Sequence, residues 1–526
     1  MKRIPQWTRF EEKLDAGRRY EDPTQEVEIR VEFSHSGSET RMVRAFWDGG
    51  NLWRFRFSPD REGQWTWRTH SADPAFDGRR GKFVCVAYSG ANPLYTHGAL
   101  RVAGNRRHFE HADGTPFLWI GDTVWNGPLK ATPRDWRVFL RDRAAKGFNA
   151  IQFVPTQWVA GAGNADLRHA YVGTDSIRID PSFFQWLDLR VDAINEHGML
   201  AVPALIWSAP SKPWALGLNP GTYLPEDQII VLARYLIARY GAHHAAWMLA
   251  GDGDYRGPLA GQWQRIGRAV IEDNSHLATM HPMGRVWVGA EFREEPWFQF
   301  HGYQSSHWGS QDSLRWITEG PPHTDWAAEP RHPVLNLEPC YESHLDMCGA
   351  PAEGRLPFDD HAVRRACYWS LLASPPAGVT YGAHGVWGWE LSRQTPMNHT
   401  ATGVAPAWRE GMRLPGSAQM KILREFFESI PWWTLLPAQE MLASQPGVDD
   451  AQNFVSAARS EDGSLALLYL PAGGAVALRP GAMPEGTSGE WIEALSGARS
   501  KAGTGVSFTA PGPGDWLLLL RAETAS

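Results

Sequence analysis

The residues best suited to chemistry are acids that follow apolar runs. In HPVLNLEPCYES, Glu338 follows the apolar residues 334–337. In WMLAGDGDY, Asp252 and Asp254 follow a second apolar run. Two carboxylates that face each other across a cleft can serve as general acid and nucleophile, which is the chemistry of glycosidic bond hydrolysis. Each acid alone is equally compatible with a helix cap or a turn. Whether the acids are catalytic therefore depends on the kind of strand that carries them.

Aromatic and polar side chains gather near the same positions. The chain has 27 Trp against 13 Tyr, and flat Trp rings stack on the apolar faces of sugars. Six Trp lie at or just past predicted strand ends: Trp125, Trp158, Trp207, Trp308, Trp387 and Trp389. Polar candidates for binding sugar hydroxyls lie there too: Asp122, Gln157, Asp254, His281, Tyr303, His307, Tyr341 and His384.

These candidates have different expected roles. We expect Glu338 to be the nucleophile and Asp252 the acid/base, with Asp254 as an alternative acid because it lies two residues further on. Glu342 is expected to pair with an Arg or a backbone amide. Asp122 has the alternative role of fixing the first loop, and single histidines are more often structural than catalytic.

Two other functions compete with this interpretation. A non-catalytic carbohydrate-binding protein would not need facing carboxylates. A metal-assisted hydrolase could use His281, His307 and Asp252. We expect no metal and no cofactor, and the candidate metal ligands Cys340, His344 and Cys348 lack a fourth ligand nearby.

The elements that must position these residues alternate between strand and helix. Helical patterns include residues 132–147, with Thr132 as cap and Pro133 in the first turn, and residues 224–241. Eight apolar strands with helices between most of them predict a (β/α)8 TIM barrel, whose functional groups lie at the carboxyl ends of its strands. The predicted strands are 117–125, 149–158, 200–208, 245–255, 278–284, 298–307, 332–342 and 378–389.

Short strands and turns on either side of this region predict two flanking β-sandwich domains. Before the barrel, alternating residues such as Phe55 and Phe57 predict an immunoglobulin-like sandwich. After a last helix at 415–430, alternating strands predict a second, smaller sandwich. The sequence therefore predicts a multidomain α/β protein, with domains at residues 1–90, 91–432 and 433–526.

Charge and composition narrow the partners. With a net charge of −7 and dispersed Lys and Arg, the chain favours a carbohydrate or glycoside substrate over nucleic acid or a membrane. No apolar segment resembles a signal peptide or a membrane span, which predicts a cytoplasmic protein. The four cysteines show no disulfide framework. An oligomer is possible.

Several motifs in order resemble the apiosidase-like glycoside hydrolases, over about residues 92–430. The part before the barrel resembles a β-sandwich of unknown function that often precedes such barrels. The last part resembles a sandwich of collagen-binding type. The motifs are GDTVW (121–125), KGFNAIQF (146–153), LAGDGD (249–254), HPMG (281–284), LNLEPCYE (335–342) and the segment 364–389.

This resemblance implies a retaining mechanism, with acid/base Asp252 on the fourth strand and nucleophile Glu338 on the seventh. Independently of the resemblance, we expect exo action that releases a terminal sugar from a short oligosaccharide or glycoside, since a cytoplasmic location favours small substrates over polymers. A furanose such as apiose is one option for the sugar. The wider clan has Asn-Glu on its fourth strand, whereas this chain has Gly-Asp. A shorter acid reaches less far, so the specificity for apiose rests on family analogy alone.

Overall fold

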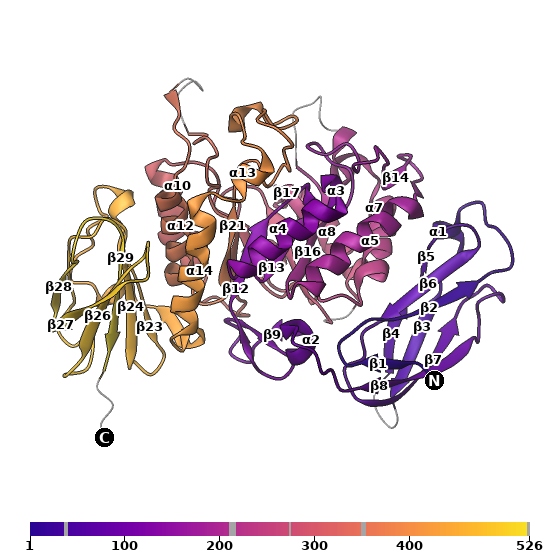
Figure 1. The fold of residues 1–526 in the computed structure, drawn as a ribbon, viewed down its shortest axis with the longest axis horizontal. Coiled ribbons are helices and arrows are strands. Elements are labelled where there is room, and N and C mark those ends of the chain that lie inside the picture. The colour runs from indigo at the N-terminus through magenta and orange to yellow at the C-terminus, as the bar shows by residue number, and fades with distance from the viewer. Residues whose placement is uncertain (36–39, 210–216, 273–274, 349–353, 523–526) are drawn as a thin grey trace.

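A barrel of eight parallel strands forms the centre of the molecule, with β-sheets from the two ends of the chain beside it (Figure 1). The computed structural model describes residues 1–35, 40–209, 217–272, 275–348 and 354–522. The barrel and its flanking sandwiches confirm the predicted fold class.

The eight barrel strands all fall within or overlap the predicted ones. In the sheet they follow one another in chain order, with β21 beside β12. The last gap, between β18 and β19, is bridged where the amide of Gln299 donates to the carbonyl of Ala278 at 3.0 Å. The strands are β12 (Trp119–Thr123), β13 (Ala150–Phe153), β16 (Leu200–Trp207), β17 (Ala246–Gly253), β18 (Leu277–Pro282), β19 (His301–Gln304), β20 (Val334–Glu338) and β21 (Gly378–Gly382).

Helices cover the outside of the barrel. The first long helix begins as predicted, with Thr132 accepting from the amide of Asp135 and Pro133 in the first turn. The longer helices are α4 (Pro133–Ala145), α5 (Pro181–Glu196), α7 (Glu226–Tyr240), α8 (Pro258–Val270), α10 (Gln311–Thr318), α12 (Asp360–Ala373) and α14 (Pro415–Glu428). Short helices are α1 (Pro23–Glu26), α2 (Pro93–His97), α3 (Gly127–Lys130), α6 (Pro220–Tyr223), α9 (Gly289–Phe292), α11 (Pro321–Thr324) and α13 (Trp408–Gly411).

The N-terminal sandwich packs two sheets around an aromatic core that includes Phe10, Phe33 and Phe55. The sequence prediction missed β1 and β2, because residues 3–15 are rich in charged residues and hide their alternation. One sheet holds β1 (Arg3–Pro5), β8 (Arg80–Val86), β7 (Gly63–His70), β3 (Arg30–His35) and β4 (Thr40–Arg44). The other holds β2 (Phe10–Asp15), β6 (Leu52–Phe57) and β5 (Phe46–Trp47).

A buried ion network joins this sandwich to the barrel. Arg56 of β6 donates to Asp188 of α5 at 2.6 Å, and Arg239 of α7 donates to both oxygens of Asp188 at 2.8 Å. Burial alone would raise the pKa of Asp188, but Arg56 and Arg239 lower it to about 2. The sandwich is therefore fixed to the helical layer by charges that stay paired.

A small sheet closes the amino-terminal end of the barrel. It consists of β9 (Leu100–Val102), β10 (Phe109–His111) and β11 (Pro116–Phe117). Phe109 meets Phe300 at 5.2 Å and Trp119 at 5.9 Å between ring centroids, which fills this end with apolar surface. This packing leaves the carboxyl ends of the strands as the open mouth of the barrel itself.

The C-terminal sheets pack on the other side of the barrel, against α12 (Figure 1). Strand β24 is buried on both faces: Leu468 faces the smaller sheet, whereas Tyr469 stacks on Tyr368 of α12 at 4.7 Å. The larger sheet holds β22 (Leu435–Pro437), β23 (Ser456–Ser460), β24 (Leu465–Leu470), β29 (Trp516–Arg521), β26 (Ser488–Glu493) and β27 (Arg499–Thr504). The smaller holds β25 (Ala475–Ala477) and β28 (Ser507–Thr509).

None of the helices in the described ranges is long and apolar enough to cross a membrane.

Candidate active site

Glu338 ends β20 and lies at the carboxyl-terminal mouth of the barrel. Its side chain is almost fully buried, and two histidines reach its two oxygens. The Nε2 atom of His307 lies 2.9 Å from Oε1, and the Nε2 atom of His281 lies 3.3 Å from Oε2. The carboxylate is thus held by a side chain of β18 and by one from the chain that follows β19.

The histidines keep Glu338 ionised. The amide of Tyr341 donates to Nδ1 of His307 at 3.3 Å, so the proton of a neutral His307 ring is on Nε2 and points to Glu338. Burial would raise the pKa of Glu338, but the contacts from His281 and His307 outweigh it and lower the pKa to about 2. A carboxylate that stays charged near neutral pH suits a nucleophile.

Asp252 lies at the end of β17, in a backbone conformation that few residues adopt. Its φ is +57°, and it lies between Gly251, which pairs with His281, and Gly253, which pairs with Pro282. Asp252 is therefore the extra residue of a β-bulge, and Asp tolerates the left-handed region better than most side chains do.

The glycines on either side of Asp252 do not supply the unusual backbone conformation. The positive φ falls on Asp252 itself and not on Gly251 or Gly253. A Cβ on Gly251 would lie 2.5 Å from the ring of Trp207, and one on Gly253 would lie 2.6 Å from the ring of Tyr255. These two glycines make room for the aromatic rings around Asp252.

The electrostatic surroundings of Asp252 are opposite to those of Glu338. Burial and then the negative charge of Glu338 raise the pKa of Asp252 to about 6. The amide of Gln304 donates to its Oδ1 atom at 3.3 Å. A carboxyl group with a raised pKa beside one with a lowered pKa provides an acid and a base in one site.

Asp254 is held away from this pair. Arg256 donates to both of its oxygens, at 2.8 and 2.7 Å, and the side chain is 40% exposed. The hydrogen bond from Arg256 lowers the pKa of Asp254, which keeps it ionised and unsuited to donate a proton.

Four of the six selected Trp rings surround the mouth. Trp207 meets Trp158 at 4.6 Å and Trp125 at 5.0 Å between ring centroids, and Trp125 meets His281 at 5.3 Å. Trp387 follows β21 and meets His399 at 5.2 Å, which in turn meets Trp158 at 6.1 Å. The rings form a continuous aromatic wall.

The other two Trp rings lie elsewhere. Trp389 stacks on Trp408 at 4.3 Å and contacts Trp136 of α4, so it belongs to the packing between barrel and helices. Trp308 is 38% exposed, with the guanidinium of Arg285 over its ring at 4.3 Å.

Several polar candidates have partners within the protein. Asp122 is fully buried and accepts from Nε of Arg143 at 2.5 Å. The amide of Gln157 donates to the carbonyl of Tyr171 and accepts from the amide of Ala170, which fixes a loop. These contacts match the alternative role of Asp122 in fixing local structure.

Tyr303 and His384 also face protein groups. Tyr303 meets Trp316 of α10 at 5.6 Å, which places it between the barrel wall and the helices. The ring nitrogens of His384 lie 3.1 Å from the carbonyl of Ser343 and 3.2 Å from the hydroxyl of Thr402, and burial lowers its pKa to about 4.

Tyr341 lies in the site, whereas Glu342 supports it from behind. The ring of Tyr341 lies against His307 at 4.4 Å and occupies space that any Cβ on Gly382 would fill. Glu342 accepts from the hydroxyl of Tyr381 and from the amide of Gly416, one of the two kinds of partner expected for it.

No group of three or more His, Cys, Asp or Glu side chains in the described ranges is arranged to hold a metal ion. Both histidines of the metal-assisted alternative direct Nε2 at Glu338 instead.

The model of a family described as "Apiosidase-like, catalytic domain" matches residues 103–434, which is more than half of the sequence. The chain belongs to this apiosidase-like family. Residues 3–72 match a domain of unknown function, DUF5060. Among curated proteins, none matches the chain.

Solved structures share the fold of this apiosidase-like protein. A protein described as a glycoside hydrolase has a TM-score of 0.71 at 22% identity, and covers 83% of this chain and 100% of its own. A glycoside hydrolase family 5 protein from Bacteroides vulgatus ATCC 8482 has a TM-score of 0.69 at 21% identity, with 81% and 94% covered. A second structure from that bacterium covers 99% of this chain and 100% of its own, at a TM-score of 0.71 and 19% identity. The apiosidase-like chain is thus a glycoside hydrolase by family, and a barrel enzyme with flanking sandwiches by fold.

Two residues that support the carboxylates were not among the sequence candidates of this apiosidase-like chain. Gln304 is the last residue of β19, and a polar residue at a strand end was the available signal. Asn336 interrupts the apolar run of β20, and a polar residue inside a core strand is such a signal as well. Both hold the acids and are not acids themselves.

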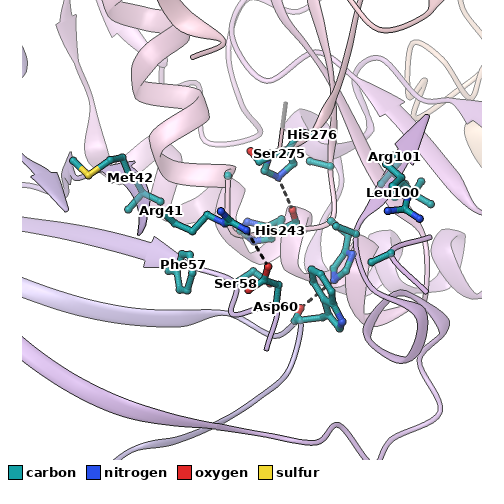
Figure 2. Close-up of a pocket in the computed structure, with 18 residues that line it drawn as sticks. Arg41, Met42, Phe57, Ser58, Asp60, Leu100, Arg101, His243, Ser275 and His276 are labelled. Carbon is teal, nitrogen blue, oxygen red and sulfur yellow. Dashed lines mark hydrogen bonds and ion pairs between the residues drawn. The ribbon is translucent and has the colours of Figure 1, made fainter. Parts of the chain in front are cut away.

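A cleft of about 510 Å³ opens far from the carboxylates of the apiosidase-like barrel (Figure 2). It lies between the N-terminal sandwich and the amino-terminal ends of the strands, since Leu200 begins β16 and Leu100 begins β9. Arg41 and Asp60 pair across one side at 3.4 Å. Because this cleft is at the opposite end of the barrel, it is not the catalytic pocket.

Proposed function

We propose that this glycoside hydrolase works by a retaining double displacement, with Glu338 as nucleophile and Asp252 as acid/base. The observation that carries the proposal is that the pKa values of the two carboxyl groups are shifted in opposite directions. The pKa of Glu338 is lowered to about 2, and that of Asp252 is raised to about 6. Their placement on the seventh and fourth barrel strands supports it, as does the family.

In the first step, an oxygen of Glu338 attacks the anomeric carbon while the bond from that carbon to the leaving oxygen breaks. Asp252 gives its proton to the leaving oxygen, so the aglycone departs as an alcohol and the sugar becomes an ester of Glu338. In the second step, Asp252 removes a proton from water, which attacks the anomeric carbon and releases Glu338 as a carboxylate.

Asp252 is preferred to Asp254 as the acid on two grounds. Asp252 is turned toward Gln304 and the charge of Glu338, whereas Asp254 is paired with Arg256. A group that Arg256 keeps ionised cannot give a proton at the pH where Asp252 still holds one.

We propose exo action on one terminal sugar of a short oligosaccharide or glycoside. Trp125, Trp158, Trp207 and Trp387 are each 3% exposed, which favours a closed pocket over an open groove. A furanose such as apiose is the sugar that family analogy alone favours.

Two indole N–H groups are proposed as sugar contacts. The Nε1 atoms of Trp207 and Trp387 are buried without a hydrogen-bond partner among the described residues. Since an unpaired buried donor costs roughly 1–3 kcal/mol, a ligand that accepts from it would gain affinity. Sugar hydroxyls and ring oxygens are such acceptors.

The test begins with a screen of aryl glycosides, both furanosides and pyranosides. With the substrate found, Glu338→Gln should fold with an unchanged thermal midpoint and lose roughly three orders of magnitude in kcat or more. Asp252→Ala should be slow on poor leaving groups, faster on 2,4-dinitrophenyl glycosides, and partly rescued by azide.

NMR of the first product decides the stereochemistry. Retention of the anomeric configuration is expected. Inversion, or normal turnover by Glu338→Gln, would contradict the mechanism. Arg256→Ala is a matched control, because it frees Asp254 and should leave kcat unchanged if Asp252 is the acid.

A further inference from the structure

A buried amide lies directly behind the nucleophile. Asn336 is 1% exposed, and its Oδ1 atom accepts from the backbone N–H of Glu338 at 3.2 Å. Its Nδ2 atom donates to the hydroxyls of Ser305 and Ser370, both at 3.0 Å. One side chain thus joins Glu338, the end of β19 and helix α12.

The strand needs this amide because its pairing is irregular there. Tyr303 pairs with Asn336, but the next residue of β19, Gln304, pairs with Glu338, so Leu337 is the extra residue of a bulge. The carbonyl of Leu337 accepts from Gln152 of β13 at 2.7 Å. Side chains therefore satisfy both polar atoms of the peptide bond that joins Leu337 to Glu338.

Helix α12, which carries Ser370, is in turn fixed to the C-terminal sandwich. Arg364 donates to both oxygens of Asp515 at 2.7 Å, and these two residues are buried. A second contact lies beside Ser370, where the indole N–H of Trp369 donates to the carbonyl of Phe454 at 2.9 Å.

We propose that Asn336 is a positioning residue for the nucleophile, and that the C-terminal sandwich holds it in place through α12 and Ser370. The inference rests on the proposed role of Glu338. A polar network buried in the barrel wall gains little for folding over apolar packing. For catalysis it matters more, because a displacement of about 1 Å in a reacting group can cost on the order of 100-fold in rate.

The first experiment compares Asn336→Ala, Ser370→Ala and a control, Ser374→Ala. Ser374 caps the carboxyl end of the same helix, four residues later, and is equally buried, but its hydroxyl donates to the carbonyl of Ser370. On the 2,4-dinitrophenyl glycoside of the sugar found in the screen, Asn336→Ala should lower kcat roughly 10- to 100-fold and leave KM within about twofold. Ser370→Ala should show a smaller loss, and Ser374→Ala none.

The activated leaving group separates positioning of the nucleophile from loss of the acid. For Asp252→Ala, the loss in rate relative to wild type should be smaller on this substrate than on one with a poor leaving group. For Asn336→Ala, the loss should be the same on both, because its defect is in the attack by Glu338. Looser contacts from His281 and His307 should also move the acidic limb of kcat/KM to higher pH in Asn336→Ala. A general loss of folded protein would change neither the limb nor the leaving-group pattern.

A second experiment tests the sandwich. Asp515→Asn should lower kcat a few-fold in the wild-type background and not at all in the Asn336→Ala background. In the latter, the hydrogen bond that connects α12 to Asn336 is already absent. An equal effect in both backgrounds would remove the sandwich from the proposal.

Wild-type kcat per folded molecule in both Asn336→Ala and Ser370→Ala would overturn the inference, as would equal losses in Ser370→Ala and Ser374→Ala. If Asn336→Ala does not fold, Ser370→Ala decides. An inactive Glu338→Gln together with unaffected Asn336 and Ser370 variants would reject this inference alone, whereas an active Glu338→Gln would reject the proposed mechanism itself.

Discussion

The protonation of Asp252 should set the alkaline limit of activity. Its raised pKa, about 6, means that the proton needed by the leaving group is present below that pH and is lost above it. We therefore expect kcat/KM on a substrate with a poor leaving group to fall about tenfold per pH unit above the limb. Kinetics between pH 4 and 9 check this.

Two controls accompany that profile. A 2,4-dinitrophenyl glycoside needs no proton and should flatten the limb, and Asp252→Asn should abolish it. A limb that persists in Asp252→Asn would assign it to another group.

For single residues, the sequence identified the candidate acids more readily than the side chains that contact them. Glu338 and Asp252 were marked by a carboxylate following an apolar run, which is visible in one dimension. The pairing of His281 and His307 with Glu338 depends on three strands meeting, which spacing along the chain does not reveal. Asp254 is distinguished from Asp252 by its exposure and by its partner, Arg256, neither of which the sequence shows.

At the carboxyl ends of the strands, the same Trp→Phe substitution at two positions can distinguish a ring that lines the sugar site from a ring that only packs against helices. Trp207→Phe should lower kcat/KM about tenfold with a small change in thermal midpoint, because it removes an N–H proposed to bind the sugar. Trp389→Phe is the matched control, since its Nε1 atom is also buried without a partner in the described part of the chain. Trp389 stacks on Trp408 in the helical layer and should keep wild-type kinetics.

Steady-state kinetics and thermal melting of both variants give the answer. Normal kinetics in Trp207→Phe, or an equal kinetic defect in Trp389→Phe, would contradict the assignment of Trp207 to the sugar site.

Strands were easier to predict than their irregularities. All eight barrel strands could be found because buried parallel strands are continuous apolar runs between helices. The bulges at Asp252 and Leu337 could not be found, because the extra residue in each is defined by the register of a neighbouring strand. The predicted strands also extended past their observed ends, into the loops that carry Trp125 and His307.

For the whole molecule, we expect the ion network of the N-terminal sandwich to control stability at low pH. The folded-state pKa of Asp188, about 2, is below the usual value for Asp. Its contribution, roughly 2–3 kcal/mol, should be complete above about pH 4 and disappear as the pH falls through 2. Urea midpoints from pH 7 to 2 measure it.

Asp188→Asn should lose about 3 kcal/mol at pH 7, because Arg56 and Arg239 would lose the buried counter-charge that they share and keep only Glu11 and Asp48 as partners. The difference between this variant and wild type should shrink at acidic pH. A constant difference would show that Asp188 acts through packing and not through its charge.

At the level of domains, composition and strand rhythm predicted three parts in the right order. What joins them could not be predicted, because Arg56 and Asp188, or Arg364 and Asp515, are separated by more than a hundred residues. Such pairs are recognisable only once the helices have packed on the sheets.

The left-handed conformation of Asp252 makes the acid position a convenient one to re-engineer. Glycine adopts a φ of +57° more readily than aspartate, so Asp252→Gly should remove the acid and relieve the backbone together. Glu338 would still accept a sugar from an activated donor, yet no group would assist water in the second step. A thiol sugar, which needs no such assistance, could then capture the sugar and turn the hydrolase into a catalyst for making sulfur-linked glycosides.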